Sequence, residues 1–436
     1  MTRKKNRVLI IGAYGLIGAQ VTRHLLARGY AVTGLGRDRE MAARVLPDVE
    51  WITRDLCDMQ RPEHWAEALQ GCSHAVNCAG ALQNTGQDDL NAVHVGAVGA
   101  LALACAGAGV GLVQISAAGV TDKANTAFLA TKARGDSAVR DAGGAWWVFR
   151  PGLVLAPTAY GGTLMLRMLA AVPWLQPVAM GHAPVQTVSV ADVARAVEGA
   201  VSGEIAPGTQ ADLVESDTHN LEEVVTGFRS WLGFLPARRI IRVQGGLVRM
   251  VARFADALGW LGWRSPLRST AMNVLENGVT GDAQQTQAAL GRSALTLQES
   301  LLSMPAGAED RLAARMALLM PVIVAVLALF WIASGVIGLI SIDSAAAVLR
   351  QQGWENGVAL SIVGFWALVD IALGVAICFR RRARQATAGM VAVSLIYLLS
   401  ATILTPFLWL DPLGVLVKVI PAMALAVVAR PMLEPR

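Results

Sequence analysis

Three glycines with the spacing G-x-x-G-x-x-G follow directly after a short apolar run near the start of the chain. The run, Val8–Ile11, predicts a central parallel strand that is buried on both faces. Ala19–Arg28 then carries apolar residues at helical spacing, and Gly29 ends this helix. A strand, a glycine turn and a helix in this order predict a dinucleotide-binding fold. The alternative is a glycine turn that serves only the fold.

Each glycine has an expected task around a pyrophosphate. Gly12 allows a sharp turn, Gly15 lets the backbone approach the phosphates, and Gly18 lets the helix pack closely against the strand. Free N–H groups at the start of the helix favour the phosphate charge. The residues of this loop that we expect to bind the cofactor are Gly12, Tyr14, Gly15, Leu16 and Ile17.

The second predicted strand, Ala31–Leu35, is followed by Gly36 and Arg37. In NAD-selective folds of this type, an acidic residue stands here and binds the ribose 2′-hydroxyl. Gly36 removes that acid, and the Arg37 guanidinium suits a 2′-phosphate through two parallel hydrogen bonds. We therefore expect NADP(H) to be preferred over NAD(H). The alternative is that Arg37 is a surface residue that caps the next helix.

Strand-like and helix-like segments continue to alternate up to Gly152, which is typical of βαβ units and predicts a doubly wound parallel sheet. Asp55, at the end of the third strand, is placed to meet an adenine amino group. Small residues after Asn77 would let a cofactor lie against the end of the fourth strand. These small residues are Cys78, Ala79 and Gly80.

At these residues the chain resembles the short-chain dehydrogenase/reductases of the extended and atypical type, which include epimerase/dehydratase-like proteins. The resemblance covers about residues 6–303 and looks closest to the branch that includes a respiratory complex I accessory subunit. The matching features are the glycine motif, Asp55-Leu56, Asn77-Cys-Ala-Gly80, Ser116, Lys132 and Arg150-Pro151-Gly152. The resemblance implies cofactor contacts for Leu56, Lys132 and Pro151, and catalytic roles for Lys132 and Ser116.

One position departs from the family's pattern. Active members carry a tyrosine four residues before the lysine, as the proton donor or acceptor at the substrate oxygen. This chain has Phe128 there, which has no exchangeable proton and cannot be a general acid or base. We expect His94 to be a packed structural group, and Tyr160 and His182 to be ordinary loop residues.

The last part of the chain differs in composition from the rest. Residues 311–436 hold long apolar runs with few charges, and the mean hydropathy of the whole chain is +0.47. Four runs are long enough to cross a bilayer, which takes about 20 apolar residues each. They are Met316–Ile340, Val358–Phe379, Ala388–Leu410 and Leu413–Ala429. The tail resembles DoxX-like four-helix membrane domains at Phe330–Gly335, Asp370, Gly374 and Lys418–Pro421.

The predicted organisation is a Rossmann domain at 1–303, whose substrate lobe is mainly 155–303, a linker at 304–314 and a membrane domain at 315–436. Arginines flank the first run on its N-terminal side and follow the second and fourth runs, whereas the other two connections are poor in arginine. Because arginines favour the cytoplasmic side, both termini and the Rossmann domain are expected in the cytoplasm of a bacterial-type inner membrane. The arginines concerned are Arg311, Arg315, Arg380, Arg381, Arg382, Arg384 and Arg430.

Charge and cysteine content exclude other classes of protein. The chain has 37 basic and 32 acidic residues, and its arginines cluster beside apolar runs, which favours membrane topology over nucleic-acid binding. Five cysteines without a C-x-x-C pair support neither a disulfide framework nor a zinc site.

Two functions remain open from the sequence. One is a membrane-anchored NADP(H)-dependent oxidoreductase for an apolar, quinone-like or lipid substrate. The other is a non-catalytic nucleotide-binding module that supports a membrane-protein partner. Inside the membrane, we expect Asp370 either to pair with Lys418 or to bind a neighbouring serine. The amphipathic stretch Leu247–Trp263 is expected to join the core of the lobe, with a place on the membrane surface as the alternative.

Overall fold

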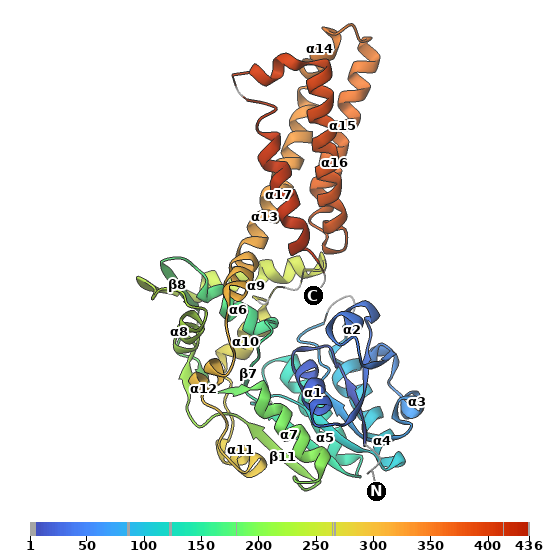
Figure 1. Cartoon of the computed structure of the whole chain (residues 1–436), viewed down its shortest axis with the longest axis vertical. Coiled ribbons are helices and arrows are strands. Elements are labelled where there is room, and N and C mark those ends of the chain that lie inside the picture. The colour runs from blue at the N-terminus through green and yellow to red at the C-terminus, as the bar shows by residue number, and fades with distance from the viewer. Residues whose placement is uncertain are drawn as a thin grey trace. The chain divides into compact units, whose positions relative to one another are not determined.

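The structure, a computed structural model, describes residues 6–84, 88–121, 124–179, 181–263, 265, 267–412 and 414–434. It contains two compact units (Figure 1). The first comprises Met1–Asp256 and Ser265–Ala314, and the second comprises Ala257–Arg264 and Arg315–Arg436. The basic start of the chain at 1–5 and Leu413, the expected first residue of the fourth membrane run, lie outside the described residues.

A seven-stranded parallel sheet forms the centre of the first unit, in the order β11-β6-β5-β4-β1-β2-β3. The chain runs outward from β1 to β3 and then crosses back to β4, so the strand order reverses beside β1. Dinucleotides bind at such a reversal in doubly wound folds. The strands are β1 (Arg7–Ile11), β2 (Ala31–Gly36), β3 (Glu50–Thr53), β4 (Cys72–Asn77), β5 (Gly111–Ile115), β6 (Trp146–Pro151) and β11 (Thr209–Leu213).

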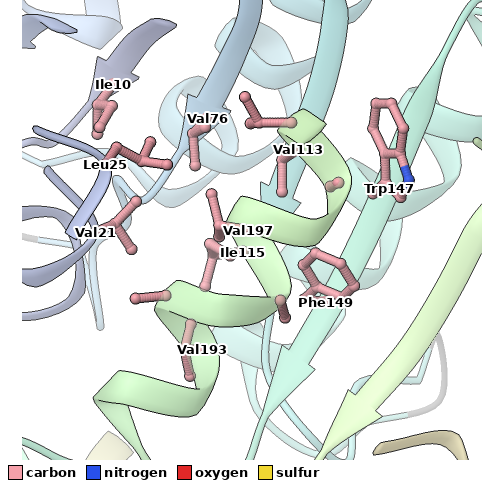
Figure 2. Close-up of a cluster of buried hydrophobic side chains, with 14 of the residues drawn as sticks. Ile10, Val21, Leu25, Val76, Val113, Ile115, Trp147, Phe149, Val193 and Val197 are labelled. Carbon is pink, nitrogen blue, oxygen red and sulfur yellow. The ribbon is translucent and has the colours of Figure 1, made fainter. Parts of the chain in front are cut away.

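Helices cover both faces of this sheet, and two apolar clusters fill the space beneath them. In β1 the side chains alternate, because Ile10 belongs to one cluster and Leu9 and Ile11 to the other. Figure 2 shows the first cluster, in which Val193 and Val197 of α7 lie over the sheet. The predicted fold class is confirmed. The covering elements are α1 (Leu16–Ala27), α2 (Arg39–Val45), η1 (Leu56–Asp58), η2 (Pro62–Trp65), α3 (Ala66–Leu69), η3 (Ala92–Gly96), α4 (Ala97–Ala108), α5 (Ala127–Asp141) and α7 (Val190–Ser202).

The rest of the first unit forms a lobe of short strands and helices. Two elements of 155–303 are part of the main sheet domain instead of the lobe. Helix α7 packs an apolar face on the main sheet, and β11 pairs with β6 as its edge strand. The lobe's elements are β7 (Leu153–Leu155), α6 (Gly161–Ala170), β8 (Leu175–Ala179), β9 (Pro184–Val185), β10 (Thr187–Ser189), β12 (His219–Asn220), α8 (Leu221–Trp231), β13 (Arg239–Val243), α9 (Gly245–Trp260), α10 (Ser269–Glu276), α11 (Ala283–Leu290) and α12 (Leu297–Leu302).

One prediction for this lobe is wrong in part. Only the small residues Ala252 and Ala255 of α9 are buried, whereas Met250 and Phe254 are exposed. The large apolar side chains of this helix therefore do not join the core of the lobe.

The second unit contains three described helices that are long and apolar enough to cross a membrane: α13, α15 and α16. The fourth expected span is shorter than predicted, because α17 has 14 residues. The helix that holds the third run, α16, begins at Arg380, eight residues before the expected run, since arginine is a good helix former, and it ends at Leu404, before the expected Leu410. The elements are α13 (Ala308–Ile340), α14 (Ile342–Arg350), α15 (Asn356–Ala376), α16 (Arg380–Leu404), η4 (Pro406–Leu410) and α17 (Val419–Met432). Helix α13 begins inside the stretch expected as a linker.

Contacts within the second unit bring the start of α16 to the end of α17. Arg384 forms an ion pair with Glu434 at 3.2 Å, and Arg380 donates a hydrogen bond to the carbonyl of Leu433 at 2.8 Å. Arginine side chains therefore gather at one end of the bundle.

Asp370 lies buried between helices of this bundle. The hydroxyl of Ser334 donates to one of its oxygens at 2.9 Å, and the hydroxyl of Tyr397 donates to the other at 2.8 Å. Lys418 is exposed and stands at the N-cap of α17. The expected Asp370–Lys418 pair is therefore wrong, and the alternative, a bond to a neighbouring serine, is confirmed.

Candidate cofactor site

The glycine loop has the geometry that a phosphate cradle needs. Gly12 has a φ of +72°, and a Cβ there would lie 2.9 Å from the backbone of Ala79. A Cβ at Gly18 would lie 2.2 Å from the carbonyl oxygen of Gly12, so helix and strand pack too closely for any side chain. The tight turn and the close packing are both as predicted.

The start of α1 is open to an anion. Gly15 is the N-cap residue, no side chain caps the helix, and the first turn holds no acidic residue. The first N–H groups of a helix lack partners within it and carry partial positive charge. The predicted residues Leu16 and Ile17 form this first turn. The loop therefore fits the pyrophosphate of a dinucleotide.

Tyr14 organises the end of β2. Its hydroxyl accepts hydrogen bonds from the backbone N–H of Arg37 at 3.2 Å and of Asp38 at 3.3 Å. A Cβ at Gly36 would lie 2.3 Å from the Tyr14 ring. Tyr14 therefore leaves no room for an acidic side chain at position 36.

Arg37 is held by two carboxylates. Its guanidinium donates to Asp88 at 2.7 Å and lies 3.8 Å from Asp55. Asp55 also caps η1, because its other oxygen accepts from the N–H of Cys57 at 3.0 Å. The sequence pattern did not indicate Asp88, since it lies far from Arg37 along the chain and outside any motif.

Asn77 shapes the turn at the end of β4. Its side-chain oxygen accepts from the N–H of Ala79 at 3.1 Å, and its amide donates to Gln114 at 2.9 Å. Burial raises the pKa of Cys78 to about 12, while Lys132 lowers it, so this thiol is neutral and unreactive at pH 7. The predicted turn residues therefore stand beside the glycine loop.

Lys132 is buried next to this turn. Its ammonium donates to the carbonyl of Ile115 at 3.0 Å and lies 5.8 Å from the centre of the Phe128 ring. A Cβ at Gly80 would lie 3.7 Å from the same ammonium. Burial lowers the pKa of Lys132, and the charge of Asp136 opposes this shift.

Asp136 joins three elements beneath Lys132. One of its oxygens accepts from the hydroxyl of Ser116 at 2.8 Å and from Arg150 at 3.0 Å, and the other has no partner among the described residues. Burial raises the pKa of this carboxyl, whereas Arg150 and Ser116 lower it. Asp136 was not predicted from the sequence. Its place one helical turn after Lys132 could have indicated it, because residues four apart on a helix are neighbours. The carbonyl of Pro151 accepts from Ala118 at 2.8 Å.

His94 is a structural residue, as predicted. It lies in the π-helical turn η3, and its Nε2 accepts from the N–H of Ala81 at 3.1 Å. Its Nδ1 lies 2.9 Å from the hydroxyl of Thr131, to which it donates, because Nε2 is the acceptor. Burial, together with the charge of Lys132, lowers the pKa of His94 to about 3. Tyr160 and His182 are exposed.

Comparisons with known proteins agree with this division of the chain. Residues 12–202 match the NAD(P)H-binding family model, and residues 328–427 match the DoxX-like family. No curated protein matches the chain in a sequence comparison.

Solved structures share the fold of the first unit. The Bordetella bronchiseptica enzyme WbmG, solved in complex with NAD, is 15% identical with a TM-score of 0.53, over 72% of this chain and 95% of that one. MoeE5 in complex with UDP-glucuronic acid and NAD is 19% identical with a TM-score of 0.52, over 69% and 97%. The NADPH-dependent quinone oxidoreductase QOR2 from Escherichia coli, with NADPH, is 18% identical with a TM-score of 0.51, over 68% and 99%.

Proposed function

We propose that this chain, which joins an NAD(P)H-binding Rossmann domain to a C-terminal DoxX-like domain, is a membrane-anchored oxidoreductase that reduces an apolar, quinone-like or lipid substrate. The proposal rests on the position of the buried Lys132. It stands beside the turn at Ala79 and Gly80, and this turn adjoins the glycine loop before the uncapped start of α1. An open phosphate cradle and a lysine at the ends of the same parallel strands are the arrangement that binds a nicotinamide nucleotide.

NADP(H) is the proposed cofactor. Gly36 leaves no acid at the end of β2, and the Arg37 guanidinium stands directly after it. Arg37 exchanges Asp88 for the 2′-phosphate in this proposal. Two charge-assisted hydrogen bonds from Arg37 to the phosphate would replace its one hydrogen bond to the Asp88 carboxylate.

The reaction that fits Phe128 is one that does not need a strong proton donor. A bound nicotinamide supplies the hydride. Phenols ionise at about pH 10, so the oxyanion of a reduced quinone is a far weaker base than the alkoxide of a reduced ketone. Lys132 places a positive charge near the reacting end of the site, which favours the oxyanion. A quinone is therefore better suited than a simple ketone.

The proposed location is the inner membrane, with both termini in the cytoplasm. Arginines stand near the start of α13, at the start of α16 and at the end of α17, and two of those in α16 contact the residues just after α17. Arginine-rich segments next to membrane spans favour the cytoplasmic side of the bilayer.

A second candidate function is nucleotide binding without turnover. It is favoured by the bond of the Ser116 hydroxyl to Asp136, which directs the serine away from a substrate, and by the absence of a hydroxyl on Phe128. In this case the domain supports a membrane partner.

Full-length protein in lipid nanodiscs separates the two. We expect NADPH binding, measured by its fluorescence, and NADPH oxidation with a short-chain ubiquinone. Lys132→Met should abolish turnover, Arg37→Ala should weaken NADPH binding about tenfold or more, and Arg44→Ala, on the next helix, is the matched control. Tight binding without oxidation by any quinone or lipid carbonyl supports the second function. No binding of either nucleotide contradicts both.

A further inference from the structure

One surface of the first unit combines exposed apolar side chains with arginines. We call residues 235–254 the basic apolar segment; it contains β13 and most of α9 (Figure 1). Between Leu232 and Asp256 the sequence has no acidic residue. Its arginines are Arg238, Arg239, Arg242, Arg249 and Arg253, all exposed. Its exposed apolar side chains include Leu235, Ile240, Ile241, Leu247, Met250 and Phe254.

Helix α9 has two unequal faces. Val248, Ala252 and Ala255 face the lobe, where they pack beside Met272 and Leu275. The outward side carries Leu247, Met250, Val251 and Phe254, which follow the i, i+3, i+4, i+7 spacing of one helical face, and Phe254 is 66% exposed. A helix that buries its small residues and exposes its large apolar ones has an unpartnered apolar face.

The neighbouring strands continue this surface. β13 pairs with β8 in a two-stranded sheet, and the N–H of Arg238 donates to the carbonyl of Trp174 at 2.8 Å. Trp174 is 66% exposed, and it alone among the described non-glycine residues has a positive φ, of +58°. A bulky side chain in this region of backbone space is strained. The fold therefore exposes the indole ring of Trp174 although its backbone conformation lowers stability.

The end of α9 indicates what covers this surface. The last residues of α9, from Ala257 on, and the stretch up to 264 belong to the second unit. There the carbonyl of Leu261 accepts from the N–H of Arg380 at 2.9 Å, and the indole of Trp263 donates to the carbonyl of Cys378 at 2.6 Å. Both partners lie at the end of the bundle that carries the arginines, so the residues directly after α9 belong to that end of the bundle. Trp260 is 90% exposed, and tryptophan is enriched where a membrane meets water.

We propose that the basic apolar segment and Trp174 lie on the cytoplasmic leaflet and bind anionic phospholipids. Its apolar side chains enter the region between headgroups and acyl chains, and its arginines contact lipid phosphates. Arg242 already has a carboxylate partner, Glu222, at 3.6 Å, so Arg249 and Arg253 on the helix are the main lipid contacts. The proposal depends on the membrane-spanning second unit and is independent of the reaction.

Photocrosslinking of the full-length protein tests the proposal. Phe254→p-benzoylphenylalanine and Leu235→p-benzoylphenylalanine are placed in nanodiscs of phosphatidylcholine with phosphatidylglycerol. Leu302, 77% exposed on α12, carries the same probe as the control. We expect lipid adducts, identified by mass spectrometry, at 254 and 235 at least threefold above those at 302. Unchanged thermal unfolding shows that each variant is folded.

A second arm tests the charge. Arg249→Gln with Arg253→Gln should lower the lipid adducts at 254 at least threefold, as should nanodiscs of phosphatidylcholine alone. Adducts at 254 that join two copies of the chain or another protein overturn the proposal, as does a lipid yield equal to that at 302. Equal yields in both lipid mixtures overturn the role of the arginines.

Discussion

The ammonium of Lys132 lies 5.8 Å from the centre of the Phe128 ring, at the place where active dehydrogenases of the resembling family have a tyrosine. A hydroxyl on this ring would be near a positive charge, which lowers the pKa of a phenol. The chain thus has the lysine of that family's pattern without its tyrosine.

Phe128→Tyr should therefore create carbonyl reductase activity. We expect the reduction of an aldehyde or ketone by NADPH to rise by about 10²-fold, the usual contribution of a placed general acid. The rate of NADPH oxidation measures this, and Phe128→Leu is the control. Unchanged rates with intact NADPH binding would show that no substrate oxygen reaches this position.

Asp88→Asn should strengthen NADPH binding. The substitution removes the negative charge that lies 2.7 Å from the Arg37 guanidinium, so a competitor of the 2′-phosphate is weakened. A tenfold lower dissociation constant corresponds to about 1.4 kcal/mol. Calorimetric titration with both nucleotides checks this, and the affinity for NADH should stay constant. A stronger gain for NADH would contradict the proposed preference.

The stability of the first unit should fall on acidification because of His94. Its pKa is about 3 in the folded chain against 6.5 in an ordinary histidine, so the unfolded state binds more protons between these values. The stability is present above pH 6.5 and is lost as the pH falls toward 3, by up to about 1.4 kcal/mol per pH unit. His94→Gln should flatten the decline of the unfolding midpoint between pH 7 and pH 4.5, whereas His182→Gln should not.

Tyr397→Phe should destabilise the membrane unit. The change removes the hydroxyl that donates to Asp370 at 2.8 Å and leaves a buried oxygen with one partner fewer. Loss of such a bond costs about 1–3 kcal/mol. Thermal unfolding in nanodiscs measures it. Lys418→Met should have no effect, and an equal loss in that variant would restore the Asp370–Lys418 pair.

Membrane topology can be read with a reporter that is active only outside the cytoplasm. Alkaline phosphatase fused after Gly353, between α14 and α15, should be active, and the same enzyme fused after Arg430 should not. The reverse pattern would place the nucleotide site on the wrong side of the membrane for a cytoplasmic cofactor.

Local patterns were enough to predict the first part of the fold. The strand Val8–Ile11, its glycine turn and the following helix are set by neighbouring residues, and the structure has all three, with the helix beginning at Leu16, three residues before the predicted Ala19. β11 and α7 could not be assigned to the main sheet because their partners, β6 and the apolar cluster beneath α7, are distant in sequence. The cofactor residues remain predictions.

Side-chain partners were harder to predict than elements. Asp88 has no motif, and its bond to Arg37 depends on the folding of a long connection. The outward apolar face of α9 has the same periodicity as a core helix, because a repeat in sequence does not tell which of two apolar surfaces will be covered.

The contact between Tyr14 and Gly36 limits how this protein can evolve. A chain that gained an aspartate at position 36, and with it a preference for NAD, would bring the new Cβ against the tyrosine ring. Tyr14 also holds the backbone at Arg37 and Asp38, so its loss would loosen the same corner. Either change alone therefore disturbs this corner of the fold. An aspartate at position 36 would therefore require a second substitution at Tyr14.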